Sequence, residues 1–242
     1  PNHGEIRVST TSGSTKGSLR ILRTAMTDIA DGTASYRHMR ERGVDWKKPL
    51  SQIRAFRADV RRQQSASSAG SWAPPWLPEA ERGKISRFSV FMPVDEQIRW
   101  LRDRPEPGYL NSLPSNLAWL IWALRRDGRP LETIIAVASV GEPVTQALRE
   151  DCRTWLGAEI IDLYSSAECG IIATECREGA FHVQSEICRL EILRPDGSSC
   201  DIGESGDVVV TPFYNFATPL LRYRTGDVAA FGPPCRCGQT LP

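Results

Sequence analysis

The sequence predicts an α/β fold in which a βαβ-type sheet region is followed by a mostly β subdomain. Helical and strand patterns alternate up to about residue 163, which is the rhythm of a parallel sheet with crossover helices. After Tyr164 the helical patterns stop, and short apolar stretches are separated by turns such as Pro195-Asp196-Gly197. We therefore expect an α/β part over residues 1–163 and a mostly β part over residues 164–242.

Local patterns define the expected elements of the first part. Glu5 to Thr11 alternates as in a short strand, and Leu19 to Ile29 has helical spacing. The apolar residues on one side of that expected helix are Leu19, Leu22, Met26 and Ile29. Ser115 to Arg126 is expected to be a helix, because four apolar residues fall on one face and Pro114 stands at its start. The other expected strands span residues 85–92, 133–139 and 159–163, and the other expected helices span residues 95–102 and 143–156.

Residues 45–82 give a poor pattern. A Gln- and Ser-rich stretch over residues 63–71 is low in complexity, and three prolines follow it closely. We expect an exposed loop or insertion there. In the second part, the expected short strands span residues 171–174, 180–183, 188–193, 207–211 and 228–231.

Composition limits the function. The chain has 242 residues with 30 basic and 29 acidic side chains, and its net charge of +1 gives no footprint of a nucleic-acid partner. No apolar run approaches the roughly 20 residues that span a bilayer, and the N-terminus does not resemble a signal peptide. We expect no nucleic acid, no membrane and a cytoplasmic location. Because the chain opens with Pro1 and stops directly after a motif, we expect a piece of a longer polypeptide.

Seven cysteines give an odd count, and Cys235 and Cys237 form a Cys-x-Cys pair. Without a secretory signal, this pattern favours reduced thiols and a metal site over a disulfide framework. Cys176 and His182 bracket a short turn. Together with the pair they make three thiolates and one imidazole, the ligands of a closed, structural Zn²⁺ site. The alternative is free cysteines and a surface histidine.

A hydroxyl- and glycine-rich loop follows the first expected strand. Its N–H groups and hydroxyls can point at phosphates, the helix expected after it would add a positive dipole end, and Lys16 can add a charge. The loop does not match the P-loop pattern, because no Lys-Ser/Thr pair follows its second glycine. A flexible loop without a ligand is the alternative. The candidate phosphate-binding residues are Thr11, Ser12, Gly13, Ser14, Thr15 and Gly17.

Two expected strands end in polar residues. Tyr164 and Glu168 follow the strand over residues 159–163, and Gly141-Glu142-Pro143 follows the strand over residues 133–139. Ligands bind at the carboxyl ends of strands in open α/β sheets. Tyr164 can stack on a base, and Glu168 can hold a Mg²⁺ ion bound to phosphates. The alternatives are an ordinary turn with a surface acid at Glu168 and a simple helix N-terminus at Pro143.

The segment Arg222-Tyr223-Arg224-Thr225-Gly226-Asp227 places two guanidinium groups and a carboxylate in one turn. Asp227 can accept both hydroxyls of a ribose, which suits the two oxygens of a carboxylate. Arg224 is a further candidate nucleotide ligand. A local salt bridge between Asp227 and one of the two arginines is the alternative. The loop, the tyrosine–acid pair and this turn, in this order, indicate a nucleotide site.

With these residues in view, the chain resembles the phenylacetate–CoA ligase family of the acyl-adenylate-forming superfamily. The most specific match is Tyr-Arg-Thr-Gly-Asp at residues 223–227, and Cys235-Arg236-Cys237-Gly238 resembles the typical ending of this branch. The resemblance runs from about Thr10 to Pro242, with a poor match over residues 45–82. It implies a fragment of the large N-terminal lobe, with a nucleotide-binding α/β part and without the C-terminal lid.

The resemblance also implies an activity, an AMP-forming acid–thiol ligase. Such enzymes react a small carboxylic acid, aromatic by family default, with Mg²⁺ and ATP to give an acyl-adenylate, and coenzyme A then displaces AMP. Position by position, the loop would bind the phosphates, Glu168 would reach Mg²⁺, Glu142 and Pro143 would border the adenine, Tyr164 would stack on it, and Asp227 would hold the ribose. The structural zinc of this branch would lie at Cys176, His182, Cys235 and Cys237.

Several departures from the family pattern keep alternatives open. Lys16 and Gly17 have traded places relative to the usual loop, and the usual glycine and hydroxyl residue near the glutamate are Ser165 and Ala167. Without a lid, this segment alone is expected to turn over slowly or not at all. A non-catalytic, zinc-stabilised binding or scaffold domain is the second hypothesis, and a ligase that makes an ester, an amide or a carrier-protein thioester is the third. A homodimer is an open alternative for the oligomeric state.

Overall fold

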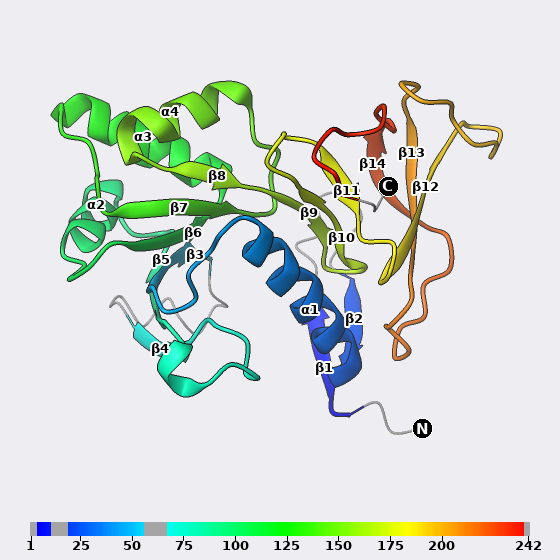
Figure 1. Cartoon of the computed structure of the whole chain (residues 1–242), viewed down its shortest axis with the longest axis horizontal. Coiled ribbons are helices and arrows are strands. Elements are labelled where there is room, and N and C mark those ends of the chain that lie inside the picture. The colour runs from blue at the N-terminus through cyan, green and yellow to red at the C-terminus, as the bar shows by residue number, and fades with distance from the viewer. Residues whose placement is uncertain (1–3, 11–18, 56–66, 240–242) are drawn as a thin grey trace. The chain divides into compact units, whose positions relative to one another are not determined.

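The computed structural model describes residues 4–10, 19–55 and 67–239. The chain divides into two compact units. Unit 1 comprises Pro1–Gly43 and Leu163–Pro242, and unit 2 comprises Val44–Asp162. Strands and helices alternate in unit 2, whereas strands dominate unit 1 (Figure 1). The predicted fold class, an α/β sheet region followed by a mostly β subdomain, is therefore confirmed.

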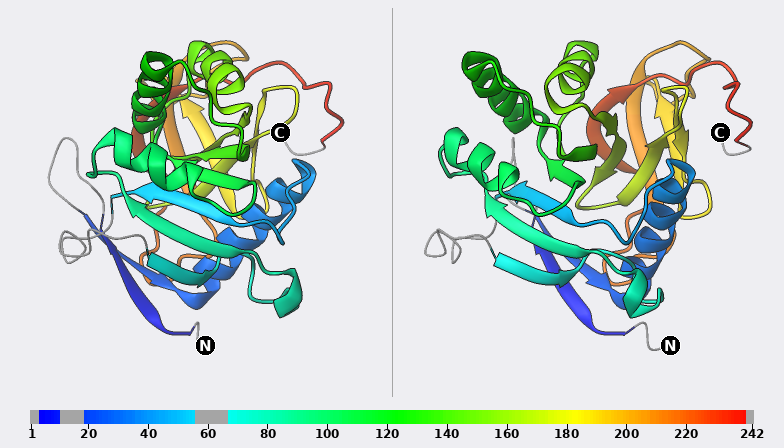
Figure 2. Two further views of the ribbon diagram at one scale, coloured as in Figure 1. Left: turned by 90° about the vertical axis from the view of Figure 1, so that its left-hand side faces the viewer. Right: turned by 60° about the vertical axis from the view of Figure 1, so that its left-hand side comes forward.

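Unit 2 is built on a six-stranded sheet with the strand order β4-β5-β3-β6-β7-β8. Its strands are parallel except β4, which pairs antiparallel with β5 at one edge. Three helices lie together over one face of this sheet (Figures 1 and 2). The strands span Leu50–Arg54 (β3), Ser67–Ser71 (β4), Lys84–Ser89 (β5), Gly108–Ser112 (β6), Ile134–Ser139 (β7) and Glu159–Ile161 (β8). The helices span Val94–Arg102 (α2), Pro114–Asp127 (α3) and Gln146–Leu156 (α4), and a 3₁₀ turn, η2, spans Glu79–Glu81.

The core of unit 2 lies between these helices and the sheet. Burial of each large apolar side chain there contributes roughly 1.5–3 kcal/mol to the free energy of unfolding. Pro114 occupies the first turn of α3, and Gly128 ends the helix with a left-handed φ of 65°. The expected apolar stripe of α3 is confirmed, because its members are buried in this core: Leu117, Leu120, Ile121 and Leu124.

Two expectations for unit 2 are wrong. Residues 45–82 are not a loop throughout, because β3 lies in the middle of the sheet and β4 forms its edge. The strand β6 is also present, where the sequence pattern indicated none. Leu50 and Ile53 of β3 belong to different apolar clusters, and β6 contains a glycine and an asparagine, so neither strand shows a clean alternation. Pairing with distant neighbours defines both strands.

Unit 1 contains, among its described residues, one helix and three small antiparallel sheets. The helix α1 (Ala25–Glu41) packs against strand β10. Buried Ile172, Val208 and Val210 belong to the apolar core of this unit. The sheets pair β1 (Ile6–Thr10) with β2 (Arg20–Thr24), β10 (Gly170–Glu175) with β9 (Leu163–Ser166) and β11 (Phe181–Val183), and β13 (Gly206–Pro212) with β12 (Cys188–Leu193) and β14 (Tyr223–Ala229).

The expectation of a helix over residues 19–29 is wrong for the first part of this segment. Its first part is strand β2, and α1 begins only after Thr24, which forms a capping box with Thr27. The residues of α1 that are buried are Thr27, Ala34 and His38, whereas Met26 and Ile29 are exposed. The apolar spacing is misleading because half of it belongs to a strand and because the helix docks through a largely polar face.

The compact units group the chain differently from the expected division at residue 163. Leu163 does begin a segment of unit 1, but residues 1–43 belong to that same unit. Contacts across the sequence explain the grouping: α1 packs on β10, and the backbone N–H of Leu22 donates to Thr218 Oγ1 at 2.9 Å. Among the described residues, no helix has the length and apolar character required to span a membrane.

The assignment of the buried face of α1 can be tested by a pair of substitutions. Ala34→Leu places extra volume where the side chain is 3% exposed, and it should lower the free energy of unfolding by about 1–3 kcal/mol through overpacking. Ile29→Ser changes a side chain that is 56% exposed and should alter stability by less than about 0.5 kcal/mol. Urea unfolding measures both variants, and the reverse order would contradict the assignment.

Candidate functional site

Tyr164 and Asp227, which come from two of the three predicted nucleotide segments, meet in unit 1. The hydroxyl of Tyr164, on β9, donates to Asp227 Oδ2, on β14, at 2.5 Å across 63 residues of sequence. A second, longer contact joins the hydroxyl to Thr225 Oγ1 at 3.4 Å. Burial and the hydrogen bond to Asp227 raise the pKa of Tyr164 well above its usual range, so the phenol stays neutral and donates. The Asp227 residue itself is exposed.

Among the described residues, Asp227 forms no salt bridge with Arg222 or Arg224, so the alternative of a local salt bridge does not hold. Arg224 pairs with Asp207 on the neighbouring strand β13. Arg222, which has a left-handed φ of 49°, pairs with Glu191 at 3.3 Å. Asp227 therefore keeps its second carboxylate oxygen outside any arginine pair. The predicted contact of Arg224 with a nucleotide stays a prediction.

Glu168 lies in the turn between β9 and β10. Ser166 Oγ accepts a hydrogen bond from the backbone N–H of Cys169 at 3.0 Å, which closes this turn. Gly170 follows with a left-handed φ of 74°. The Glu168 residue is half-buried, and no hydrogen bond or ion pair holds its carboxylate within the part of the chain that the structure describes. The predicted contact of Glu168 with Mg²⁺ stays a prediction.

The phosphate-loop candidates lie outside the described residues, and they are Thr11, Ser12, Gly13, Ser14, Thr15, Lys16 and Gly17. The described residues on either side do correct one expectation. Thr10 pairs with Arg20 in an antiparallel hairpin, so the loop joins two strands rather than a strand and a helix. A helix N-terminus therefore does not follow the loop, and the dipole that we expected there is absent from its described flanks.

Gly141, Glu142 and Pro143 belong to unit 2, where they follow β7. Gly141 adopts a left-handed φ of 83°. The carboxylate of Glu142 accepts hydrogen bonds from Ser115 N at 2.8 Å and from Ser115 Oγ at 2.9 Å. Since Leu113 at the N-cap of α3 offers no side-chain cap, Glu142 supplies the missing acceptor from outside the helix. The structure thus gives Glu142 a local structural contact, while its predicted place beside an adenine stays a prediction.

The four predicted metal ligands come together in unit 1. Cys176 directly follows β10, His182 lies on β11, and Cys235 and Cys237 follow β14. All four ligand atoms lie within 4.8 Å of one another. Cys176 Sγ lies 3.8 Å from Cys235 Sγ, and Cys237 Sγ lies 3.3 Å from His182 Nε2. Tetrahedral zinc with Zn–S bonds of about 2.3 Å separates two sulfurs by about 3.8 Å. The donor set therefore fits a closed tetrahedral site.

Three other cysteines are chemically different from this cluster. Burial, as the largest cause, raises the pKa of Cys152 and Cys188 to about 12 and that of Cys169 to about 11. These thiols stay neutral at physiological pH and serve as small apolar side chains in the two cores.

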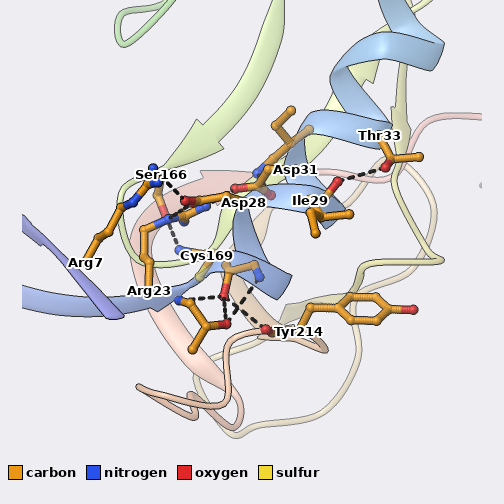
Figure 3. Close-up of polar contacts among 12 residues, drawn as sticks. Arg7, Arg23, Asp28, Ile29, Asp31, Thr33, Ser166, Cys169 and Tyr214 are labelled. Atoms are coloured by element: carbon orange, nitrogen blue, oxygen red, sulfur yellow. Dashed lines mark hydrogen bonds and ion pairs between the residues drawn. The ribbon is translucent and has the colours of Figure 1, made fainter. Parts of the chain in front are cut away.

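Sequence reasoning missed a charged cluster beside the Glu168 turn (Figure 3). Arg23 on β2 pairs with Asp31 and Asp28 of α1, and Asp31 Oδ1 accepts a hydrogen bond from the backbone N–H of Ile171 at 3.2 Å. We call Arg23, Asp28 and Asp31 the Arg23 cluster. The sequence signal for this cluster is an arginine followed by acids in the first turns of a helix. The apolar spacing hides this signal, because it predicts a helix where β2 lies.

The structural contact of Glu142 predicts a stability effect. Glu142→Ala removes the acceptor at the N-terminus of α3 and should lower the free energy of unfolding by about 1 kcal/mol. Glu132→Ala, which removes an exposed carboxylate in the same unit, is the matched control and should have almost no effect. Urea unfolding distinguishes them, and equal stabilities for the two variants would rule out the capping role.

The chain is similar in sequence to known proteins. No protein-family model matches the chain. The phenylacetate-coenzyme A ligase of Thermus thermophilus is 31% identical over 157 residues, which cover 61% of this chain and 35% of that protein. The Escherichia coli enzyme of the same name is 31% identical over 148 residues, covering 58% of this chain and 34% of that protein. The chain thus spans about a third of the length of the curated relatives that it matches.

Solved structures show the same fold. An open conformation of 2-hydroxyisobutyryl-CoA ligase superposes with a TM-score of 0.77 at 18% identity, covering 100% of this chain and 52% of that one. The anthranilate CoA ligase AuaEII, in complex with anthranoyl-AMP, gives a TM-score of 0.65 at 17% identity over 88% of this chain and 40% of that one. The resemblance is confirmed: the chain is similar in sequence to phenylacetate-coenzyme A ligases, and its fold is similar to part of these two CoA ligase structures.

Proposed function

We propose that the chain is the nucleotide-binding part of an AMP-forming acid–CoA ligase. The whole protein would react a small carboxylic acid with ATP to give an acyl-adenylate and pyrophosphate, and then transfer the acyl group to coenzyme A. The names of the sequence relatives and the anthranoyl-AMP of a structural neighbour support this class. An aromatic acid is the first substrate to test, because phenylacetate and anthranilate occur in those names.

The observation that carries the proposal is the contact between Tyr164 and Asp227. It joins an aromatic ring and an exposed carboxylate that the sequence assigned separately to a base and a ribose. The Tyr164 hydroxyl holds one carboxylate oxygen, and the other would be left to accept from the ribose hydroxyls. Because the ring is only half-buried, one part of it remains accessible for stacking on adenine.

The proposed chemistry is largely electrostatic. The substrate carboxylate attacks the α-phosphorus of ATP, the bond to pyrophosphate breaks, and the thiol of CoA later displaces AMP from the acyl carbon. The loop around Ser12 and the charge of Lys16 would stabilise the phosphate oxygens as negative charge moves onto the leaving group. Glu168 would hold Mg²⁺, which supplies further positive charge at the phosphates. No nucleophile or general base of the protein is needed for either step.

A structural zinc is the second part of the proposal. Cys176, His182, Cys235 and Cys237 would bind Zn²⁺ with no open position, so the ion would stabilise the fold rather than take part in the reaction. It would tie the segment after β14 to the β10–β11 hairpin. Such ligand sets stabilise small, loop-rich regions.

Mg·ATP binding tests the proposed nucleotide site. Isothermal titration calorimetry on the chain should show binding that weakens about 10- to 100-fold in Asp227→Ala, because hydrogen bonds to a charged group contribute about 1.5–3 kcal/mol. Asp201→Ala is the matched control, since this carboxylate is 89% exposed in the same unit and its partner Arg194 keeps Glu204. The control should bind like the wild type.

The possible outcomes separate the hypotheses. Binding that both substitutions leave unchanged would place the nucleotide elsewhere. A folded wild-type chain that binds no ATP would favour the non-catalytic scaffold. Acid-dependent release of pyrophosphate by the full-length protein would then test the reaction itself, with phenylacetate as the first substrate.

Metal content tests the zinc proposal. The purified chain should contain about one equivalent of zinc, and the Cys235→Ser, Cys237→Ser double variant should lose it, because two of four ligands are removed. Cys200→Ser is the control, because this cysteine lies outside the cluster. Plasma mass spectrometry of the three proteins gives the answer, and full zinc retention in the double variant would refute the assignment.

A further inference from the structure

Helix α1 makes polar contacts with several segments of unit 1, one of which borders the Glu168 turn. Near its N-terminus, Thr27 Oγ1 donates to the carbonyl of Tyr214 at 3.0 Å. In the middle, Asp31 accepts from the N–H of Ile171 at the start of β10. Between these contacts stands Arg23, on the strand that leads out of the phosphate loop. The helix thus connects strand β2, which directly precedes it, to two regions that are distant in sequence, around Ile171 and Tyr214.

Asp31 lies at the centre of this arrangement (Figure 3). Its side chain is 22% exposed and that of Arg23 is 15% exposed, so their ion pair is largely shielded from water. Arg23 Nε also pairs with Asp28 Oδ1 at 3.2 Å. Shielding strengthens the attraction within the pair, but it also makes removal of one partner costly. Burial raises the pKa of Asp31 from its usual value, while Arg23 and the Ile171 N–H act in the opposite direction.

The approach of Asp31 to the Glu168 turn requires a glycine. A Cβ atom on Gly170 would lie 2.3 Å from Asp31 Oδ1 and 2.5 Å from Oδ2, which is closer than atoms can approach. Gly170 also has a left-handed φ of 74°. Only a glycine at this position lets the carboxylate reach the backbone beyond it. Two independent features of residue 170 therefore fit the contact between α1 and the turn.

The contact between Asp31 and Ile171 lies close to Glu168 in the sequence. Ile171 is three residues after Glu168, and Glu168 itself lies in the turn that the hydrogen bond from Cys169 N to Ser166 Oγ closes. On the other side, Arg23 is three residues after Arg20, the partner of Thr10 at the stem of the phosphate loop. The Arg23–Asp31 ion pair and the hydrogen bond from Ile171 to Asp31 therefore connect the strand beside the loop to the turn that carries Glu168.

We propose that Asp31 is a positioning residue for the nucleotide site: paired with Arg23, it holds the Glu168 turn in register with the stem of the phosphate loop. This role rests on the proposed function. Glu168 and the loop act on the same phosphates from different segments, so their relative position decides whether a metal bound at Glu168 reaches them. Asp31 touches neither substrate nor metal.

The test uses the 242-residue chain and three variants. Asp31→Ala removes both the ion pair and the acceptor for Ile171 N–H, while Arg23 keeps Asp28. Asp31→Asn keeps a possible acceptor and loses the charge. Glu186→Gln is the matched control. It breaks an ion pair of Arg37 on the same helix, but that ion pair connects α1 to the segment after β11 and not to the Glu168 turn.

Titrations with two nucleotides distinguish a positioning role of Asp31 from a general weakening of the nucleotide site. Mg·ATP uses the Glu168 turn and the phosphate loop, whereas AMP depends mainly on Tyr164 and Asp227. In calorimetric titrations, Asp31→Ala should weaken Mg·ATP about tenfold more than it weakens AMP, with Asp31→Asn in between. Glu186→Gln should leave the affinity ratio unchanged. Equal weakening of both nucleotides would overturn the positioning role, since a structural defect affects the whole site.

Amide hydrogen exchange provides a readout that needs no nucleotide. The N–H of Ile171 and the turn before it should exchange about tenfold faster in Asp31→Ala, while the β12–β13 pair keeps its protection. Unchanged exchange at Ile171 would overturn the link between Asp31 and the turn, even if ATP binds well. A folded wild-type chain that binds neither nucleotide would overturn the proposed function and this role with it, whatever the exchange shows.

Discussion

The docking of α1 by polar side chains is the constraint on which unit 1 depends. Most helices in globular proteins bury an apolar stripe, but α1 buries Thr27, Ala34 and His38, with the partly shielded Asp31 between them. Apolar contact is non-directional, whereas each hydrogen bond or ion pair fixes a distance and an angle. A helix that docks in this way contributes less burial energy, but it sets its neighbours in one register.

The contacts of α1 continue to its C-terminus. Arg37 donates to Glu186 Oε2 at 2.8 Å, and Arg42 Nη1, just past the helix, donates to the carbonyl of Cys176 at 3.0 Å. Glu41 accepts from Gln239 Nε2 at 2.6 Å. The last two contacts reach the segments that carry the metal ligands. The proposed zinc site is thus attached to the C-terminal end of α1, and the Glu168 turn is attached through Asp31 nearer its middle, so loss of either attachment would loosen the same helix.

The sequence predicts elements well where local pattern and burial agree. The stripe of α3, with Pro114 before it and Gly128 after it, is sufficient to place that helix. Prediction from the sequence fails where pairing with distant residues determines whether a strand forms, as for β3 and β6. The Cys176, His182 and Cys235 pattern could be read from side-chain chemistry alone, and the structure brings these residues together. The Arg23 cluster could not be found in this way, because an arginine and two aspartates are ordinary surface residues until β2 and β10 are placed.

The loop predicted to bind phosphates joins two antiparallel strands, β1 and β2, and this changes which groups can supply positive charge to it. A loop before a helix receives about half a positive charge from the helix N-terminus. A loop between antiparallel strands receives none, so its amides, its hydroxyls and Lys16 would have to balance the phosphate charge themselves. Lys16 and Gly17 have traded places relative to the family pattern. Without a helix dipole, this change would affect the main positive charge of the loop and not a minor addition to it. Under this geometry, the position of the Glu168 turn and of any metal that it holds matters more, because less positive charge comes from the backbone.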